Sequence, residues 1–240
     1  MPWCRRSLRV VDVLFHESGM PHILLINPNS SQATTEMMVA IARSTLPAGY
    51  ALSGVSARQG PGMIVNAVEL AAAGEEVERN WREGGRHSVG AIISAFGDPG
   101  IERLRALDGR PVAGLCEASM LEAAEGGRRF GVATVTPELA DVIGEKAQQA
   151  GVAGRYTGIR LTAGDPRVLA ADPQALEEAL AEAVRACVER DGAEAVVIGG
   201  GPLGQAALAL AQRFPVPVIA PIPAAVRYLL KALQALEAAA

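Results

Sequence analysis

Cysteine is scarce in this chain, where Cys4, Cys116 and Cys187 are scattered over 240 residues. Three thiols at these spacings exclude a disulfide framework and paired-cysteine metal ligation. Apolar runs are also short, and none approaches the roughly 20 residues that a membrane-spanning helix needs. We therefore expect a protein of the reducing cytoplasm that does not span a membrane.

Aromatic residues and basic patches are lacking too. Aromatics make up 4% of the chain against 50% for all apolar residues, so the core must be built from Ala, Val, Leu and Ile, as is typical of helices packed on parallel sheets. The net charge is −4 with no basic stripe, which excludes the electrostatic footprint of a nucleic-acid or anionic-membrane partner. We expect a small molecule as the partner.

The first residues differ from the rest of the chain. Arg5 and Arg6 precede apolar residues, as in an export signal, but Asp12 and the pair His16–Glu17 interrupt the apolar stretch. No small-residue cleavage pattern closes it. The sequence predicts that residues 1–19 are a disordered extension and that Met20 opens the folded domain.

From Met20 onward, short apolar strands alternate with helices, and the whole set occurs twice. Alternation of this kind predicts an α/β fold with parallel sheets and right-handed crossovers. We expect two similar four-stranded domains, formed by residues 21–115 plus 221–240 and by residues 116–220, with residues 116–125 bridging them. The predicted strands are 22–26, 51–57, 90–94, 111–115, 130–137, 156–161, 195–199 and 216–220. The predicted helices are 32–46, 64–82, 101–107, a segment ending near 150, 173–190, 203–213 and 224–236.

Two of these helices carry apolar stripes that we expect to face the core. In helix 64–82 the stripe is Val65, Val68, Ala72 and Val77, and in helix 173–190 it is Leu176, Leu180, Val184 and Cys187. His22 and His87 have no visible partner in the sequence, and we expect solvated surface for both.

Two strand ends indicate where a ligand binds. The strands at 90–94 and 195–199 both stop at small residues and proline. Ligands bind at the carboxyl ends of strands in open α/β sheets, so two such ends in matching places predict one site shared by the two halves. We further expect the strand ends at 27–30 and 134–136 to line the same crevice.

The candidate binding residues all lie at these four strand ends. Five of them also have a structural explanation: turn formation for the asparagines, strand-end packing for the threonines, and capping of the helix near Pro99 for the aspartate. Ser94 points away from the crevice if strand alternation continues through it. Three glycines in a row predict close approach of a ligand to successive N–H groups, suited to a carboxylate. The candidates are Asn27, Asn29, Ser94, Phe96, Asp98, Thr134, Thr136, Gly199 and Gly201.

Four ordered motifs resemble the hydantoin and allantoin racemase branch of the aspartate/glutamate racemase superfamily. They are Ile26–Ser30, Phe96–Gly100, Pro111–Ala118 and Ala195–Gly199. The resemblance implies two α/β domains related by a pseudo-twofold axis, a site between them, no cofactor, no metal and assembly into a homo-oligomer. It also implies racemisation by two cysteines, one on each face of the substrate's α-carbon.

Neither of these cysteines is present. The resemblance places them at Ala95 and Gly200, and neither alanine nor glycine carries a proton. Cys116 and Cys187 are expected to be buried core residues, which leaves the catalytic residues unassigned.

Three hypotheses follow. The protein acts on a hydantoin-like amino-acid derivative or a carboxylate by proton transfer without the usual thiols, as an isomerase or a decarboxylase of the arylmalonate type. It binds such a molecule without catalysis. Or it is a racemase that was inactivated by engineering.

Overall fold

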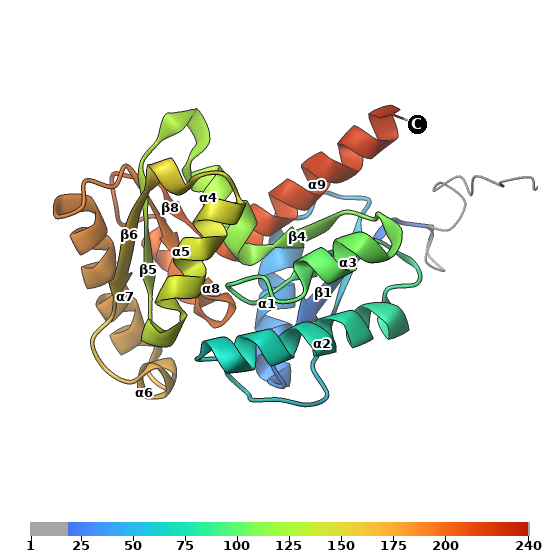
Figure 1. Cartoon of the computed structure of the whole chain (residues 1–240), viewed down its shortest axis with the longest axis horizontal. Coiled ribbons are helices and arrows are strands. Elements are labelled where there is room, and N and C mark those ends of the chain that lie inside the picture. Colours follow the sequence, from blue (N-terminus) through green and yellow to red (C-terminus); the bar gives the residue numbers. More distant parts are fainter. Residues whose placement is uncertain (1–18, 240) are drawn as a thin grey trace, which may run out of the picture.

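The computed structural model describes residues 19–239, and the predicted extension at residues 1–19 lies outside this range except for Gly19. The described chain forms two four-stranded sheets that are parallel throughout (Figure 1). The first has the order β2-β1-β3-β4 and the second has the order β6-β5-β7-β8. The strands are β1 His22–Asn27, β2 Ala51–Ser56, β3 Ser88–Ile93, β4 Val112–Gly114, β5 Phe130–Thr134, β6 Tyr156–Leu161, β7 Ala195–Ile198 and β8 Val218–Ile219. These sheets confirm the predicted α/β class.

Nine α-helices accompany the strands within the described range. Eight of them correspond to predicted helices or to the predicted bridge, and the short helix α6 was not predicted. Their bounds are α1 Gln32–Thr45, α2 Ala67–Gly84, α3 Ile101–Asp108, α4 Leu115–Ala123, α5 Ala140–Gln149, α6 Pro166–Ala170, α7 Pro173–Glu189, α8 Gly204–Leu210 and α9 Pro221–Ala239.

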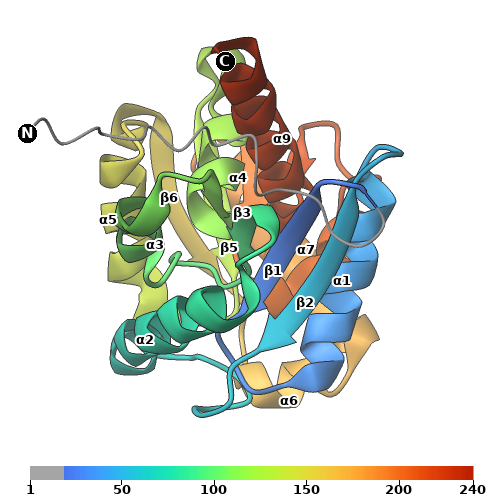
Figure 2. The ribbon, with the colours of Figure 1, turned by 90° about the vertical axis from the view of Figure 1, so that its right-hand side faces the viewer.

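The first sheet is buried on both faces, because alternate side chains of its central strand enter different cores. Ile23 and Leu25 of β1 pack with residues of α1 and α9. Leu24 and Ile26 pack on the other face with residues of α2 and α3. Figure 2 shows α1 and α2 on opposite sides of β1 and β2.

The second sheet is layered in the same way. Phe130 and Val132 of β5 face α5, whereas Ala133 faces α7 and α8. The predicted stripe of α7 is confirmed, since Leu176, Leu180, Val184 and Cys187 are all buried. The repeated layering explains why the two halves of the sequence show the same order of apolar runs.

The helices α4 and α9 connect the two halves. α4 continues directly from β4 and contacts β7, β8 and α5 of the second half, while α9 returns to pack on α1, α4, β3 and β4. One hydrophobic cluster contains residues of both sheets together with these helices. In Figure 1 the last turns of α9 project away from this shared core. The packing of α9 supports our division of the chain, which stays a prediction.

Two of the burial predictions are wrong. In α2 the buried residues include Leu70, Ala73, Gly74 and Val77, whereas Val68 is 81% exposed and Ala72 is exposed as well. The inward face is set by a close approach between the backbones of Gly74 and Gly100, where an added side chain would collide. Small residues therefore face inward here.

The second correction concerns His22. Its ring is buried, and its nitrogens lie 2.9 Å from the hydroxyl oxygens of Ser88 and Ser53 on the neighbouring strands. His87 is exposed, as predicted.

Candidate functional site

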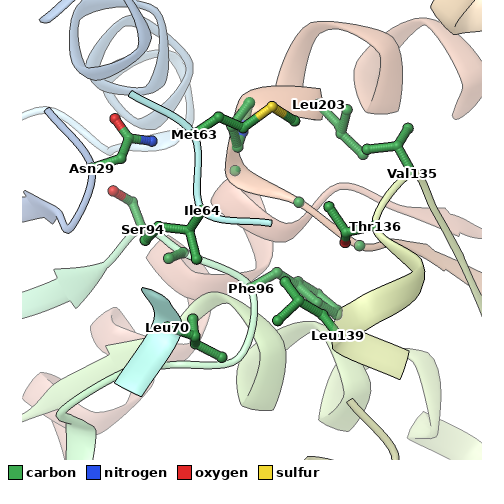
Figure 3. Close-up of a pocket in the computed structure, with 15 residues that line it drawn as sticks. Asn29, Met63, Ile64, Leu70, Ser94, Phe96, Val135, Thr136, Leu139 and Leu203 are labelled. Carbon is green, nitrogen blue, oxygen red and sulfur yellow. The ribbon is translucent and has the colours of Figure 1, made fainter. Parts of the chain in front are cut away.

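A small pocket lies between the two halves at the carboxyl ends of their strands (Figure 3). The centres of water molecules can occupy about 40 Å³ of this cavity. On the same measure, a site for one water needs roughly 10–15 Å³. The cavity is therefore suited to a small guest. Its lining residues are Asn29, Met63, Ile64, Leu70, Ser94, Ala95, Phe96, Val135, Thr136, Leu139, Gly199, Gly200, Gly201, Pro202 and Leu203.

Ala95 and Gly200 line this pocket together. Ala95 follows β3 in the first half and Gly200 follows β7 in the second half. Matching strand ends in two parallel sheets thus line one pocket, as their positions in the sequence predict. The structure also brings six of the nine candidate binding residues to the lining: Asn29, Ser94, Phe96, Thr136, Gly199 and Gly201.

Ser94, Ala95 and Phe96 all reach the pocket although they are consecutive. β3 ends at Ile93, so the alternation of a strand no longer applies to Ser94. The Ser94 hydroxyl donates to the carbonyl of Ile26 at 3.0 Å, which fixes its direction. Phe96 lies against the second half. A Cβ atom added at Gly199 would be only 3.2 Å from the Phe96 ring, which shows how closely the ring approaches the Gly199 backbone.

Asn29 presents a hydrogen-bond donor to the pocket. Its oxygen Oδ1 accepts from the Asn27 side chain at 2.8 Å and from the Ser31 N–H at 2.9 Å. Because both partners are donors, the atom that they contact must be the side-chain oxygen. The amide nitrogen then points towards Met63, as Figure 3 shows. Asn27 lies behind Asn29, outside the lining, and donates to Asn29 and Thr35.

The two threonines after β5 have different surroundings. The Thr134 hydroxyl lies outside the lining and donates to the carbonyl of Gly199 at 2.5 Å. The Thr136 hydroxyl lines the pocket and lies 3.4 Å from the Thr134 oxygen, which is too long for a strong hydrogen bond. Thr136 is therefore a second polar group that a ligand can contact.

The glycine run does not offer a row of free N–H groups. The N–H of Gly199 donates to the carbonyl of Ala133, and that of Gly200 donates to the carbonyl of Ile198. The prediction of successive free donors is therefore wrong for these two residues. The role of Gly199 is steric, because an added side chain there would strike Val132 and Thr134.

Asp98 is buried beside the pocket loop and caps α4, not the helix near Pro99. Its two carboxylate oxygens accept from the N–H groups of Cys116 and Glu117, each at 2.8 Å. Gly114 makes room, since a side chain there would overlap the carboxylate. Burial raises the pKa of Asp98 to about 6, although the two backbone N–H groups oppose that shift. Asp98 therefore connects the loop that carries Ala95 to the helix that joins the halves.

Both described cysteines are buried, as predicted, and neither lines the pocket. Burial raises the pKa of the Cys116 thiol well above its ordinary value and raises the pKa of Cys187 to about 12. A thiol with so high a pKa is protonated near neutral pH and is a poor base.

The described lining contains no Asp, Glu, His, Cys, Lys, Arg or Tyr. No cluster of potential metal ligands occurs among residues 19–239 either, and no helix in that range combines the length and apolar character needed to cross a membrane. The pocket can therefore hold a small guest through Asn29, Thr136 and its apolar wall. Its side chains do not supply an acid or base that works near neutral pH.

Several lining residues were not among the candidates. Met63 and Ile64 come from the loop between β2 and α2, and the loop carries no polar motif that would single them out. The other five give only an apolar residue in the sequence, one on α2 and four at or just after predicted strand ends. These are Leu70, Val135, Leu139, Pro202 and Leu203.

The substitution Gly201→Ala is expected to separate the two pocket walls. An added Cβ would lie 2.5 Å from the backbone oxygen of Ser94, and the resulting overpacking should lower the free energy of unfolding by about 2 kcal/mol. Gly200→Ala is the matched control. Its Cβ meets only the flexible side chain of Leu203, so we expect a loss below about 1 kcal/mol. Urea unfolding measures both, and equal losses would contradict the close contact of the walls.

A comparison with protein-family models matches residues 23–229 to the model described as Asp/Glu/Hydantoin racemase. The chain is 34% identical to a hydantoin racemase of Paenarthrobacter aurescens over 209 residues, which cover 85% of this chain and 88% of that protein. It is 31% identical to a hydantoin racemase of Pseudomonas sp. (strain NS671), with coverage of 86% and 83%.

A solved structure of allantoin racemase from Klebsiella pneumoniae is also similar. Its sequence is 30% identical, and the TM-score is 0.84 with coverage of 90% of this chain and 89% of that chain. The similarity therefore extends over almost all of the described fold.

Proposed function

Because this chain belongs to the Asp/Glu/hydantoin racemase family, we propose that its interdomain pocket binds a small amino-acid derivative of the hydantoin or allantoin kind. Membership of the family supports racemase-type activity on a small substrate. The ring carbonyls of such a molecule are acceptors, and the Asn29 amide and the Thr136 hydroxyl are donors on the pocket wall. The apolar residues of the lining face its substituent.

One observation carries the proposal, namely that the described lining has no ionisable side chain. A buried carboxylate without a cationic partner is costly, so this lining favours a neutral ring over an amino-acid carboxylate or an arylmalonate. The same observation supports binding without two-thiol racemisation, since Ala95 and Gly200 stand where the two thiols are expected. We therefore propose a small-molecule-binding protein on a racemase scaffold.

Calorimetric titration with 5-methylhydantoin and allantoin tests the binding. We expect saturable binding of a neutral hydantoin and none of aspartate, glutamate or phenylmalonate. Saturable binding of a dicarboxylate with no binding of either ring compound would contradict the proposal.

The substitution Asn29→Asp is expected to weaken hydantoin binding by at least about tenfold. An aspartate keeps the oxygen that accepts from Asn27 and Ser31, so the turn is preserved. It replaces the donor nitrogen with a charged oxygen, which repels a ring carbonyl. Titration gives the affinity, and the melting temperature shows whether the fold is retained. An unchanged affinity would remove Asn29 from the binding site.

A second function, racemase-type proton transfer without a cofactor, is favoured by the identity to two hydantoin racemases. The exchange of the ring C5 proton in deuterated water tests it. Exchange by the wild-type protein well above the protein-free rate would support this second function and would require a proton-transferring group outside the described lining.

A cytoplasmic location and a homo-oligomer remain predictions. The scarcity of cysteine supports the first. The second is supported only by resemblance, and light scattering on the purified protein measures it.

A further inference from the structure

Met63 has a position that the sheets and helices do not explain. It lies in the loop of residues 57–66, called the strap here, which connects β2 to α2. The strap belongs to the first half, yet Met63 packs on a cluster whose buried members all come from the second half. Figure 3 shows its side chain extending towards Leu203 across the pocket.

The strap is fastened to the turn that carries Asn29. The Ser30 N–H donates to the carbonyl of Pro61 at 3.0 Å, and the Ser30 hydroxyl donates to the carbonyl of Gly60 at 3.1 Å. At its start, the N–H of Ala57 donates to the carbonyls of Asn27 and Asn29. The strap and the polar corner of the pocket therefore form one unit.

The other apolar walls are more firmly held. Leu70, Val135, Leu139 and Leu203 are at most 5% exposed, and they sit on helices or directly beside strand ends. Met63 is only partly buried and sits on a loop with Gly60 and Gly62 on either side of Pro61. Methionine is unbranched and adapts its shape readily. Ile64 shares the strap and is also partly buried, but its β-branched side chain is stiff. Of the two strap residues that line the pocket, Met63 is therefore the one whose side chain can adjust to a substituent.

We propose that Met63 is the specificity-determining residue of this pocket, because its side chain forms the wall that sets how large a ligand substituent can be. The inference rests on the proposed binding of a hydantoin-like molecule, and it adds which hydantoins the pocket accepts. Small 5-substituents fit beneath Met63, whereas large ones require the strap to move and break its contacts with Ser30.

The test compares three probes, 5-methylhydantoin, 5-isobutylhydantoin and 5-benzylhydantoin, by calorimetric titration. The wild-type protein should bind the methyl compound at least about tenfold more tightly than the benzyl compound. Met63→Ala should tighten binding of the benzyl compound by at least about tenfold and leave the methyl compound nearly unchanged. Met63→Trp should abolish binding of the benzyl compound.

Two control variants separate this effect from a general disturbance. Met63→Leu conserves volume and should keep the wild-type order of affinities. Val68→Ala lies just beyond the strap on an exposed position and should leave all three affinities unchanged. If Met63→Ala leaves the wild-type preference for the methyl over the benzyl compound unchanged, the inference is wrong while the proposed function stands. If no protein binds any hydantoin, the proposed function fails and the inference fails with it.

Discussion

The double substitution Ala95→Cys with Gly200→Cys is expected to give hydantoin racemisation at a rate at least about 100-fold above the wild-type protein, since positioned acid–base groups contribute roughly 10²–10⁴-fold. Both positions line one pocket. A thiolate at one wall would remove the C5 proton of a ring held between the walls. The thiol at the other wall would return a proton to the opposite face.

The backbone at both positions can carry a cysteine side chain. Ala95 already has a Cβ atom, and Gly200 has an extended backbone with φ of 164° that any residue adopts. A Cβ at Gly200 would lie 2.9 Å from Leu203 Cγ, so this side chain must turn aside. Polarimetry of L-5-methylhydantoin and proton exchange in deuterated water, both in reductant at pH 8, measure the rate.

The single variants and a serine pair are the controls. A single cysteine should exchange the C5 proton faster than it racemises, because the opposite face has no donor. Ala95→Ser with Gly200→Ser has similar volume but no group that ionises near neutral pH, and we expect wild-type behaviour from it. A folded double-cysteine variant that binds hydantoin and neither exchanges nor racemises it would contradict the placement of the two positions on opposite faces.

The second large effect concerns Asp98 and pH. The pKa of Asp98 is about 6 in the folded chain, raised by burial from 3.8. Between these values the folded chain binds more protons than the unfolded chain. The stability that Asp98 contributes is therefore fully present below pH 3.8 and is lost as the pH rises through 6. Since one pKa unit corresponds to about 1.4 kcal/mol, the loss between pH 4 and pH 7 should be about 2–3 kcal/mol.

Comparison with Asp98→Asn isolates this contribution. The amide does not titrate, so the stability of the wild-type protein relative to this variant should fall as the pH rises from 4 to 7. Unfolding in urea at each pH measures the difference. A difference that is flat, or that grows with pH, would contradict the raised pKa.

Asp191→Asn is a control of opposite sign. The hydrogen bond from Arg160 lowers the pKa of Asp191. The contribution of Asp191 to the free energy of unfolding is therefore present above pH 3.8, and it is lost as the pH falls through the lowered pKa of the folded chain. Relative to this second variant, the wild-type protein should lose stability on acidification.

The sequence was sufficient to predict the architecture because the signals that set it are local. Runs such as Val196–Ile198 are too short for a helix and end at glycines, and their repetition in both halves predicts the two sheets. The same local signals place two similar strand ends at matching positions of the two halves, which predicts one shared ligand site, and Ala95 and Gly200 both line it.

The failures of prediction come from contacts between residues far apart in the chain. His22 is buried because its two ring nitrogens form hydrogen bonds with the hydroxyls of Ser53 and Ser88 on the neighbouring strands. Asp98 caps a helix that begins seventeen residues later, which no local capping pattern reveals. Met63 reaches the pocket because the strap crosses to the other half, and only the packing of the two halves shows that.

A single NMR titration tests the central claim, that this pocket binds a neutral hydantoin without its own proton-transferring pair. The sample is protein with ¹³C-methyl alanine and methionine in deuterated water, titrated with 5-methylhydantoin. We predict saturable shifts of the Ala95 and Met63 methyl signals while the C5 proton signal of the ligand decays no faster than without protein. Saturation that leaves both methyl signals in place, or rapid loss of the C5 proton, would contradict the account.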